Sequence, residues 1–231
     1  MAKIRKIVIT AVLLAAGVTC AVVFSFILIA NVFDLSSSRK EYSYLSEFTK
    51  TPGASSLSSL DSEMRGINPD YLCWITIEGT RVDYPVVRGA DNEKYLNMSF
   101  FSEENIYGTL FLDYRCIGET VPHLIIYGHN AKTGDMFGDL HLFLNSRYME
   151  EHPAISLTLG EHVVEYEIFA ARSTDVHDIA YTLNFGFPGS FGAFAESCGA
   201  PLNTEQIITL STCVSGNDKD ERIIVQGAFH R

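Results

Sequence analysis

Basic residues are scarce in this sequence, and their scarcity limits the partners the protein can have. The chain has 17 Lys and Arg against 28 Asp and Glu, and three of the bases lie before residue 7. The rest of the chain therefore carries 14 bases against 28 acids. Such a protein would make each phosphate contact against its own negative field. The composition argues against nucleic acid as a partner.

Cysteines are few, and their spacing excludes two common uses. No two of the five have the Cys-x-x-Cys spacing of zinc or thioredoxin-like sites. Cys20 lies in an apolar run, which leaves Cys73, Cys116, Cys198 and Cys213. In an oxidising compartment four thiols allow two disulfides in three connectivities. The alternative for the first three is a small buried hydrophobic side chain.

Internal repeats are absent, and low-complexity sequence is limited to a short serine cluster around residues 55–59. The chain is 47% hydrophobic and 19% charged, which excludes a disordered protein. Its 231 residues suffice for one well-buried domain plus an appendage.

The appendage is expected at the N-terminus, where charge is absent from Ile7 to Ala30. Roughly 20 helical residues cross a ~30 Å bilayer core. A secretory signal peptide has an apolar region of only about 7–15 residues, and a buried core helix is the other alternative. Because Lys3, Arg5 and Lys6 precede the run, the positive-inside rule predicts a cytoplasmic N-terminus and an extracellular remainder.

We expect three parts along the chain. Residues 1–33 form a cytoplasmic tip and transmembrane anchor, residues 34–67 a juxtamembrane helical or linker segment, and residues 68–231 the folded domain. In the middle part, a helix is expected with apolar residues on one side, followed by a flexible connection near Pro52. Those apolar residues are Tyr42, Tyr44, Leu45 and Phe48.

The folded domain consists of short β-branched and aromatic runs separated by turn residues. The predicted strands are Trp74–Glu78, Tyr84–Val87, Gly108–Leu112, Leu124–Tyr127, Ile155–Leu159, Val163–Ala171, Gln206–Ser211 and Arg222–Ala228. Many short strands at this spacing indicate a barrel or sandwich, a mainly β fold. Helices are expected near residues 92–97, 134–144 and 189–198. The long connection from Arg172 to Glu205 is expected to pack down through Phe185, Phe187, Phe191 and Phe194.

Cys213 differs from the other cysteines because it ends an apolar strand. A polar turn follows it, and Arg222 opens the next run, so a hairpin would place a fixed cation beside the thiol. A neighbouring cation lowers a thiol's pKa and favours the nucleophilic thiolate. Arg can instead donate hydrogen bonds to an oxyanion that develops during acyl transfer.

A cysteine nucleophile also needs a proton carrier, and His129 is the best placed of the seven histidines. It follows the apolar strand Leu124–Tyr127 where that strand enters a polar loop, as Cys213 does in its own strand. His123 begins the same strand. The remaining five, which lie in polar segments, are expected to be solvated surface residues: His141, His152, His162, His177 and His230.

Three segments together resemble the signature of sortases, the membrane-anchored cysteine transpeptidases of Gram-positive bacteria. They are Tyr127-Gly128-His129-Asn130, Thr209-Leu210-Ser211-Thr212-Cys213 and Arg222-Ile223-Ile224-Val225. The resemblance runs from about Asn68 to the end. The chain is similar to class B sortases in the segments at residues 91–96, 110–115 and 136–140 and in the long insertion before the cysteine strand. The resemblance implies an eight-stranded β-barrel with flanking helices and an N-terminal transmembrane helix.

The resemblance also implies a two-step reaction on secreted proteins that carry a C-terminal sorting signal. Cys213 would attack the carbonyl after the signal's Thr to form a thioester, and an amine of cell-wall peptidoglycan would resolve it. His129 would move the protons, and Arg222 would hold the signal and stabilise the oxyanion. A thioester conserves acyl reactivity without ATP. The anchor would hold the enzyme where exported substrates meet lipid-linked wall precursor.

By the same resemblance, six residues are candidates for the signal's groove: Asn92, Leu96, Ser211, Thr212, Tyr181 and Ile179. We expect no cofactor and no metal. Class A sortases bind calcium and class B members generally do not, and Glu103-Glu104 is better explained as a solvated loop. Val214 departs from the polar residue that relatives often have after the nucleophile, which puts secondary substrate contacts in doubt.

Three alternatives stay open at this point. A pilin lysine could replace the wall amine, which would make the protein a pilin-polymerising sortase. Water could resolve the same thioester, which would give hydrolysis. A non-catalytic, disulfide-stabilised extracellular module on a membrane tether would instead have an oxidised, unreactive Cys213.

Overall fold

The computed structural model describes residues 2–50, 57–118, 121–213 and 220–230. It divides into two compact units, residues 1–41 and 42–231. The first unit consists of most of helix α1 (Ala2–Lys50), in which Val12–Ile29 is long and apolar enough to cross a membrane, with a mean hydropathy of 2.7. The side chains of that stretch are exposed, which is inconsistent with a buried core helix.

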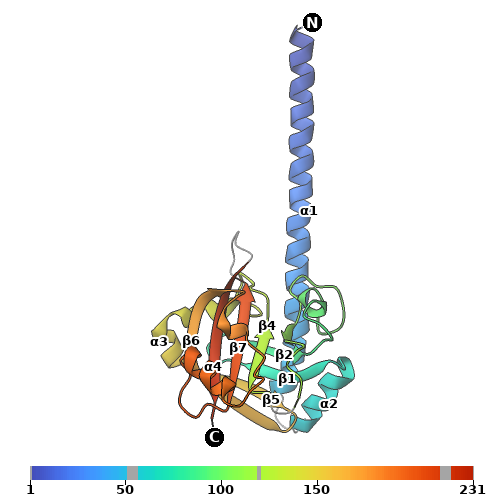
Figure 1. Cartoon of the computed structure of the whole chain (residues 1–231). Coiled ribbons are helices and arrows are strands. Elements are labelled where there is room, and N and C mark those ends of the chain that lie inside the picture. The colour runs from blue at the N-terminus through green and yellow to red at the C-terminus, as the bar shows by residue number, and fades with distance from the viewer. Residues whose placement is uncertain (1, 51–56, 119–120, 214–219, 231) are drawn as a thin grey trace. The chain divides into compact units, whose positions relative to one another are not determined.

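The second unit is a closed eight-stranded barrel (Figure 1). Its strands are β1 (Tyr71–Thr76), β2 (Asp83–Val87), β3 (Leu110–Leu112), β4 (His123–Tyr127), β5 (Ala154–Leu159), β6 (His162–Asp175), β7 (Gln206–Cys213) and β8 (Glu221–Phe229). Around the barrel the order is β1-β2-β3-β4-β7-β8-β6-β5, so the mainly β fold expected from the sequence is confirmed. The pairs β2–β3 and β4–β7 are parallel, and the other pairs are antiparallel.

Short helices connect and cover the strands. They are α2 (Leu57–Ile67), η1 (Lys94–Leu96), η2 (Gly138–Leu144), α3 (Ser146–Glu151), η3 (Ile179–Tyr181) and α4 (Ser190–Cys198). Helices α2 and α3 were not expected from the sequence. Helix α3 has a short-range signal, because the Asn145 side chain accepts hydrogen bonds from the backbone N–H groups of Arg147 and Tyr148 as an N-cap.

The C-terminal end of α1 belongs to the folded unit. Tyr42 and Leu45 are buried in the core, and the Tyr42 hydroxyl donates to the Gly108 carbonyl at 2.8 Å. Tyr44, expected on the same side, is 52% exposed, because two residues along a helix turn a side chain away by about 200°. The side chain of Phe48 and the connection at Pro52 lie outside the described residues.

Helix α4 packs on the barrel through a second, smaller apolar cluster. Phe194, Ala195 and Cys198 bury against Ile207 of β7, with Phe185 and Phe191 partly buried beside them. The prediction that the long connection packs down is therefore right for these aromatic residues. It is wrong for Phe187, which is 70% exposed in the turn before the helix.

Candidate active site

The register of three neighbouring strands brings the predicted catalytic residues to one end of the barrel. Strands β4 and β7 run parallel with Tyr127 opposite Ser211, and the Gly128 N–H continues the ladder to the Ser211 carbonyl at 3.1 Å. His129 lies two residues beyond Tyr127, and Cys213 lies two beyond Ser211. In the antiparallel pair β7–β8, Cys213 is opposite Arg222. The backbone of Cys213 ends β7, and its side chain lies outside the described residues, as does Val214.

Tight packing and one hydrogen bond fix the position of His129. A Cβ on the preceding Gly128 would come within 2.3 Å of Leu110 Cδ2 and 2.7 Å of Phe137 Cδ2, so only glycine fits there. The His129 Nε2 lies 2.6 Å from the Leu96 carbonyl oxygen. Because a carbonyl only accepts, Nε2 carries the proton, and in the neutral ring Nδ1 carries the lone pair.

A groove of about 670 Å³ opens at this end of the barrel. Eight of the nine predicted site residues line it: His129, Arg222, Asn92, Leu96, Ser211, Thr212, Tyr181 and Ile179. The ninth, Cys213, is the next residue in β7 after Thr212. Strand ends, η1 and the segment after β6 thus converge on one cavity that a peptide can enter.

Two of these residues already hold each other in place. The hydroxyls of Tyr181 and Ser211 lie 2.7 Å apart, and the Tyr181 ring stacks on Tyr127, with 6.5 Å between ring centroids and 7° between planes. The segment around η3 is thereby joined to the cysteine strand. Asn92 is likewise engaged, since its side-chain oxygen accepts from the Tyr114 backbone N–H at 3.0 Å.

The hydroxyl of Thr212 has no hydrogen-bond partner among the described residues, although the residue is only 2% exposed. A buried polar atom without a partner costs about 1–3 kcal/mol. Thr212 lines the groove, so the atom lies where a bound peptide could supply the missing bond.

Groove residues that the sequence did not single out include Arg115, Tyr127 and His177. Arg115 donates through Nε and Nη2 to the buried carboxylate of Asp113, at 2.9 and 2.7 Å, and the Tyr127 hydroxyl donates to the same carboxylate at 3.0 Å. Burial alone would raise the pKa of Asp113, but these hydrogen bonds outweigh it and lower the pKa. In the sequence, the Asp-x-Arg spacing could have pointed to Arg115, and the position directly before Gly128 could have pointed to Tyr127. His177, expected on the surface, is exposed but belongs to the groove wall.

The remaining cysteines of the folded unit are buried and unpaired. Cys73, Cys116 and Cys198 form no disulfide, which leaves the small-hydrophobe interpretation for these three. Burial raises the pKa of Cys73 to about 12 and also raises the pKa of Cys116 and Cys198. These thiols are therefore protonated and inert near neutral pH.

No group of three or more His, Cys, Asp or Glu side chains suited to a metal ion occurs within the part of the chain that the structure describes. Glu103 and Glu104 are both exposed.

Comparison with known proteins identifies the class. A family model of the sortase domain matches residues 75–229, and the chain therefore belongs to the sortase family. Among curated relatives it is similar to sortase B of Listeria monocytogenes, with 32% identity over 71% of this chain and 72% of the relative. It is also similar to sortase B of Staphylococcus aureus, with 29% identity over 69% and 70%.

A solved structure agrees in fold. The Staphylococcus aureus sortase B–substrate complex superposes with a TM-score of 0.76 at 24% identity, covering 85% of this chain and 97% of that one. The resemblance to class B stated from the sequence is confirmed, and membership of this family supports a transpeptidase function.

Proposed function

We propose that this protein is a cysteine transpeptidase that cleaves a C-terminal sorting signal after Thr and transfers the secreted protein to a peptidoglycan amine. The observation that carries the proposal is the strand register, which puts Cys213, His129 and Arg222 at one end of β7, β4 and β8. His129 and Arg222 also line the groove, as do Ser211 and Thr212 of β7.

In the first step the Cys213 thiolate attacks the carbonyl carbon of the signal's Thr. The oxygen takes up negative charge, which the Arg222 guanidinium would stabilise from the strand beside the cysteine strand. When the C–N bond breaks, the leaving amine takes a proton from the His129 imidazolium. The products are a Cys213 thioester, a neutral His129 and the released signal tail.

In the second step a neutral amine attacks the thioester carbonyl. Its proton passes to neutral His129, the C–S bond breaks, and the thiolate and imidazolium are restored. A thioester keeps the acyl group reactive toward an amine without input of ATP. The Leu96 carbonyl would keep the His129 ring in one orientation during both transfers, because it holds Nε2–H at 2.6 Å.

The N-terminal helix supports a membrane location for this reaction. Val12–Ile29 is apolar enough to span a bilayer, and bases precede it, which favours a cytoplasmic N-terminus and an extracellular barrel. Lipid-linked wall precursor and exported substrates would both reach an enzyme anchored in this way.

The test uses the full chain in detergent with a library of pentapeptide signals and several amines, including glycine peptides, stem-peptide amines and a pilin-type lysine peptide. Mass spectrometry reads both the product and the acyl group on Cys213. We expect transfer to a peptidoglycan-type amine, loss of all turnover in Cys213→Ala and in His129→Ala, and normal turnover in the control Cys73→Ala. Turnover that survives Cys213→Ala would remove the mechanism, and transfer only to lysine or water would replace the acceptor.

A further inference from the structure

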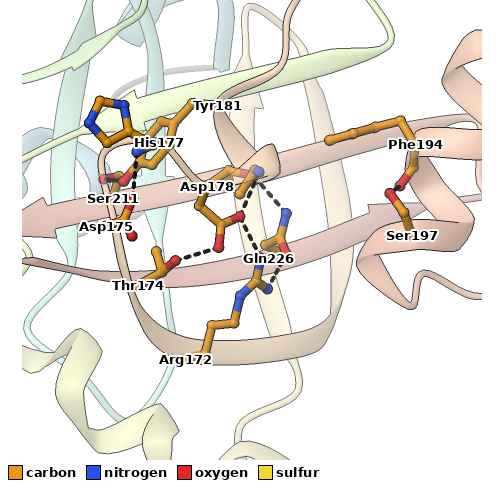
Figure 2. Close-up of polar contacts among 12 residues, drawn as sticks. Arg172, Thr174, Asp175, His177, Asp178, Tyr181, Phe194, Ser197, Ser211 and Gln226 are labelled. Atoms are coloured by element: carbon orange, nitrogen blue, oxygen red, sulfur yellow. Dashed lines mark hydrogen bonds and ion pairs between the residues drawn. The ribbon is translucent and has the colours of Figure 1, made fainter.

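The segment of residues 176–182 forms one wall of the groove and lies between β6 and α4. It contributes Asp178, Ile179 and Tyr181 to the lining and contains the short helix η3. It pairs with no strand, so it is held to the barrel by the Tyr181–Ser211 hydrogen bond and by side-chain hydrogen bonds at its two ends. Figure 2 shows the first of these ends.

Asp178 anchors the start of η3. Its carboxylate accepts from Arg172 Nη2 at 2.8 Å, from the Ala180 backbone N–H at 2.7 Å and from the Thr174 hydroxyl (Figure 2). Burial alone would raise the pKa of Asp178, but these bonds reverse the effect and lower it. The side chain is therefore an ionised cap on η3, and β6 supplies both Arg172 and Thr174.

His123 anchors the end of the segment. Its Nδ1 lies 2.7 Å from the Thr182 carbonyl oxygen, and its Nε2 lies 2.8 Å from the Thr209 hydroxyl. The carbonyl can only accept, so Nδ1 donates. Burial lowers the pKa of His123 to about 4, so the ring is neutral at pH 7 and Nε2 accepts from Thr209.

Gln226 connects Thr209 with Arg172. Since the Thr209 hydroxyl donates to His123, its oxygen accepts from Gln226 Nε2 at 3.1 Å. The Gln226 side-chain oxygen in turn accepts from Arg172 Nη1 at 2.9 Å (Figure 2). The donor and acceptor of each hydrogen bond in this series are thus fixed. The Arg172 guanidinium at one end can only donate, and the Thr182 carbonyl at the other end can only accept.

One guanidinium therefore serves both ends of the wall. Arg172 reaches Asp178 directly, and it reaches Thr182 through three residues on β8, β7 and β4 that are fully buried: Gln226, Thr209 and His123. A buried polar group that lost its partner in this network would be left without a hydrogen bond and away from water, which is unfavourable. That cost favours one arrangement of the wall over others.

We infer that Arg172 and Asp178 are positioning residues for the signal-binding wall. They act through η3, which holds Tyr181 against Ser211 and presents Ile179 to the groove. The inference rests on the proposed function, since it assigns the wall to sorting-signal binding and not to the chemistry at Cys213.

The test replaces each partner conservatively in the full chain in detergent. Arg172→Lys keeps the charge but loses the planar fork that serves two acceptors, and Asp178→Asn keeps the cap but loses the ion pair. The matched controls are Arg147→Lys and Glu151→Gln, which alter an exposed Arg–carboxylate pair on α3. The substrate is a signal peptide that wild-type enzyme turns over in the library assay.

We expect KM for the peptide to rise about tenfold in both wall variants, with kcat within twofold of wild type and no change in the controls. Amide hydrogen exchange, read by mass spectrometry, should accelerate at least tenfold in residues 176–183 and stay unchanged in β7. If one of the two variants does not fold, the other alone tests the positioning role.

An unchanged KM, a fall in kcat alone, or wild-type exchange across residues 176–183 would each overturn the inference. If wild-type enzyme transfers no peptide to any amine, the proposed function fails instead. Hydrogen exchange then still decides whether Arg172 and Asp178 hold the wall.

Discussion

The buried imidazole of His123 predicts that the folded protein loses stability in mild acid. Its pKa is about 4 in the fold because of burial, against an ordinary value of 6.5. The unfolded chain takes up a proton as pH falls through 6.5, and the folded protein does not do so until pH 4. Stability is therefore fully present above pH 6.5, declines from pH 6.5 to 4 and levels off below.

The size of the effect follows from the pKa difference. Between pH 7 and pH 5 the folded state should lose about 2 kcal/mol through His123, and about 3 kcal/mol by pH 4. The assay is denaturant unfolding of the full chain in detergent at several pH values. Trp74, the single tryptophan, is 2% exposed and donates to Asp83 at 2.7 Å, so its fluorescence reports on unfolding.

The variant His123→Gln isolates this contribution, because other groups that titrate over the same range are shared with wild type. The difference in unfolding free energy between wild type and variant should shrink by about 2 kcal/mol from pH 7 to pH 5. A difference that stays constant over this range would show that burial does not lower the pKa of His123, and the predicted loss of stability in mild acid would then be wrong.

Three further predictions concern other parts of the molecule. Arg222→Lys should lower turnover about a hundredfold, the scale for removing one oxyanion donor; near-normal rates would reduce Arg222 to packing. Thr212→Val should keep or raise the thermal midpoint, because it removes an unpartnered hydroxyl, while KM for the signal peptide rises roughly fivefold; a lowered midpoint with unchanged KM would contradict this. Leu45→Ala should lower the unfolding free energy by about 2–5 kcal/mol, whereas Tyr44→Ala, an exposed neighbour, should cost far less; equal effects would place Leu45 outside the core.

The strands and the location of the candidate catalytic residues were accessible from the sequence because they depend on local signals. Apolar runs that end just before His129 and at Cys213 mark strand ends, and the parallel pairing of those strands, with Tyr127 opposite Ser211, brings both residues to the same end of the barrel. The same logic put Arg222 opposite Cys213, since two strands that are close in sequence commonly pair as an antiparallel hairpin.

The polar network beneath the groove wall was not accessible in this way. Its members are 59 positions apart between His123 and Thr182 and 54 apart between Arg172 and Gln226, and no local pattern signals such pairings. The sequence showed only that His123 begins an apolar strand, and its burial depends on that strand's neighbours. Helix α2 was missed because Ser and Gly in Leu57–Ile67 are poor helix formers, and burial of Leu60 and Met64 compensates for them.

The burial of Tyr42 and Leu45 has a practical consequence for anyone who wishes to crystallise or assay the barrel without its tether. A version that begins where the family similarity starts, at residue 75, would discard α2, most of β1 and both of those side chains. Solvent would then enter between Tyr84 and the carbonyl of Gly108, which Tyr42 now covers. The cut belongs just before Tyr42, at the boundary of the second compact unit, even though that keeps a stretch of helix outside the residues that the sortase family model matches.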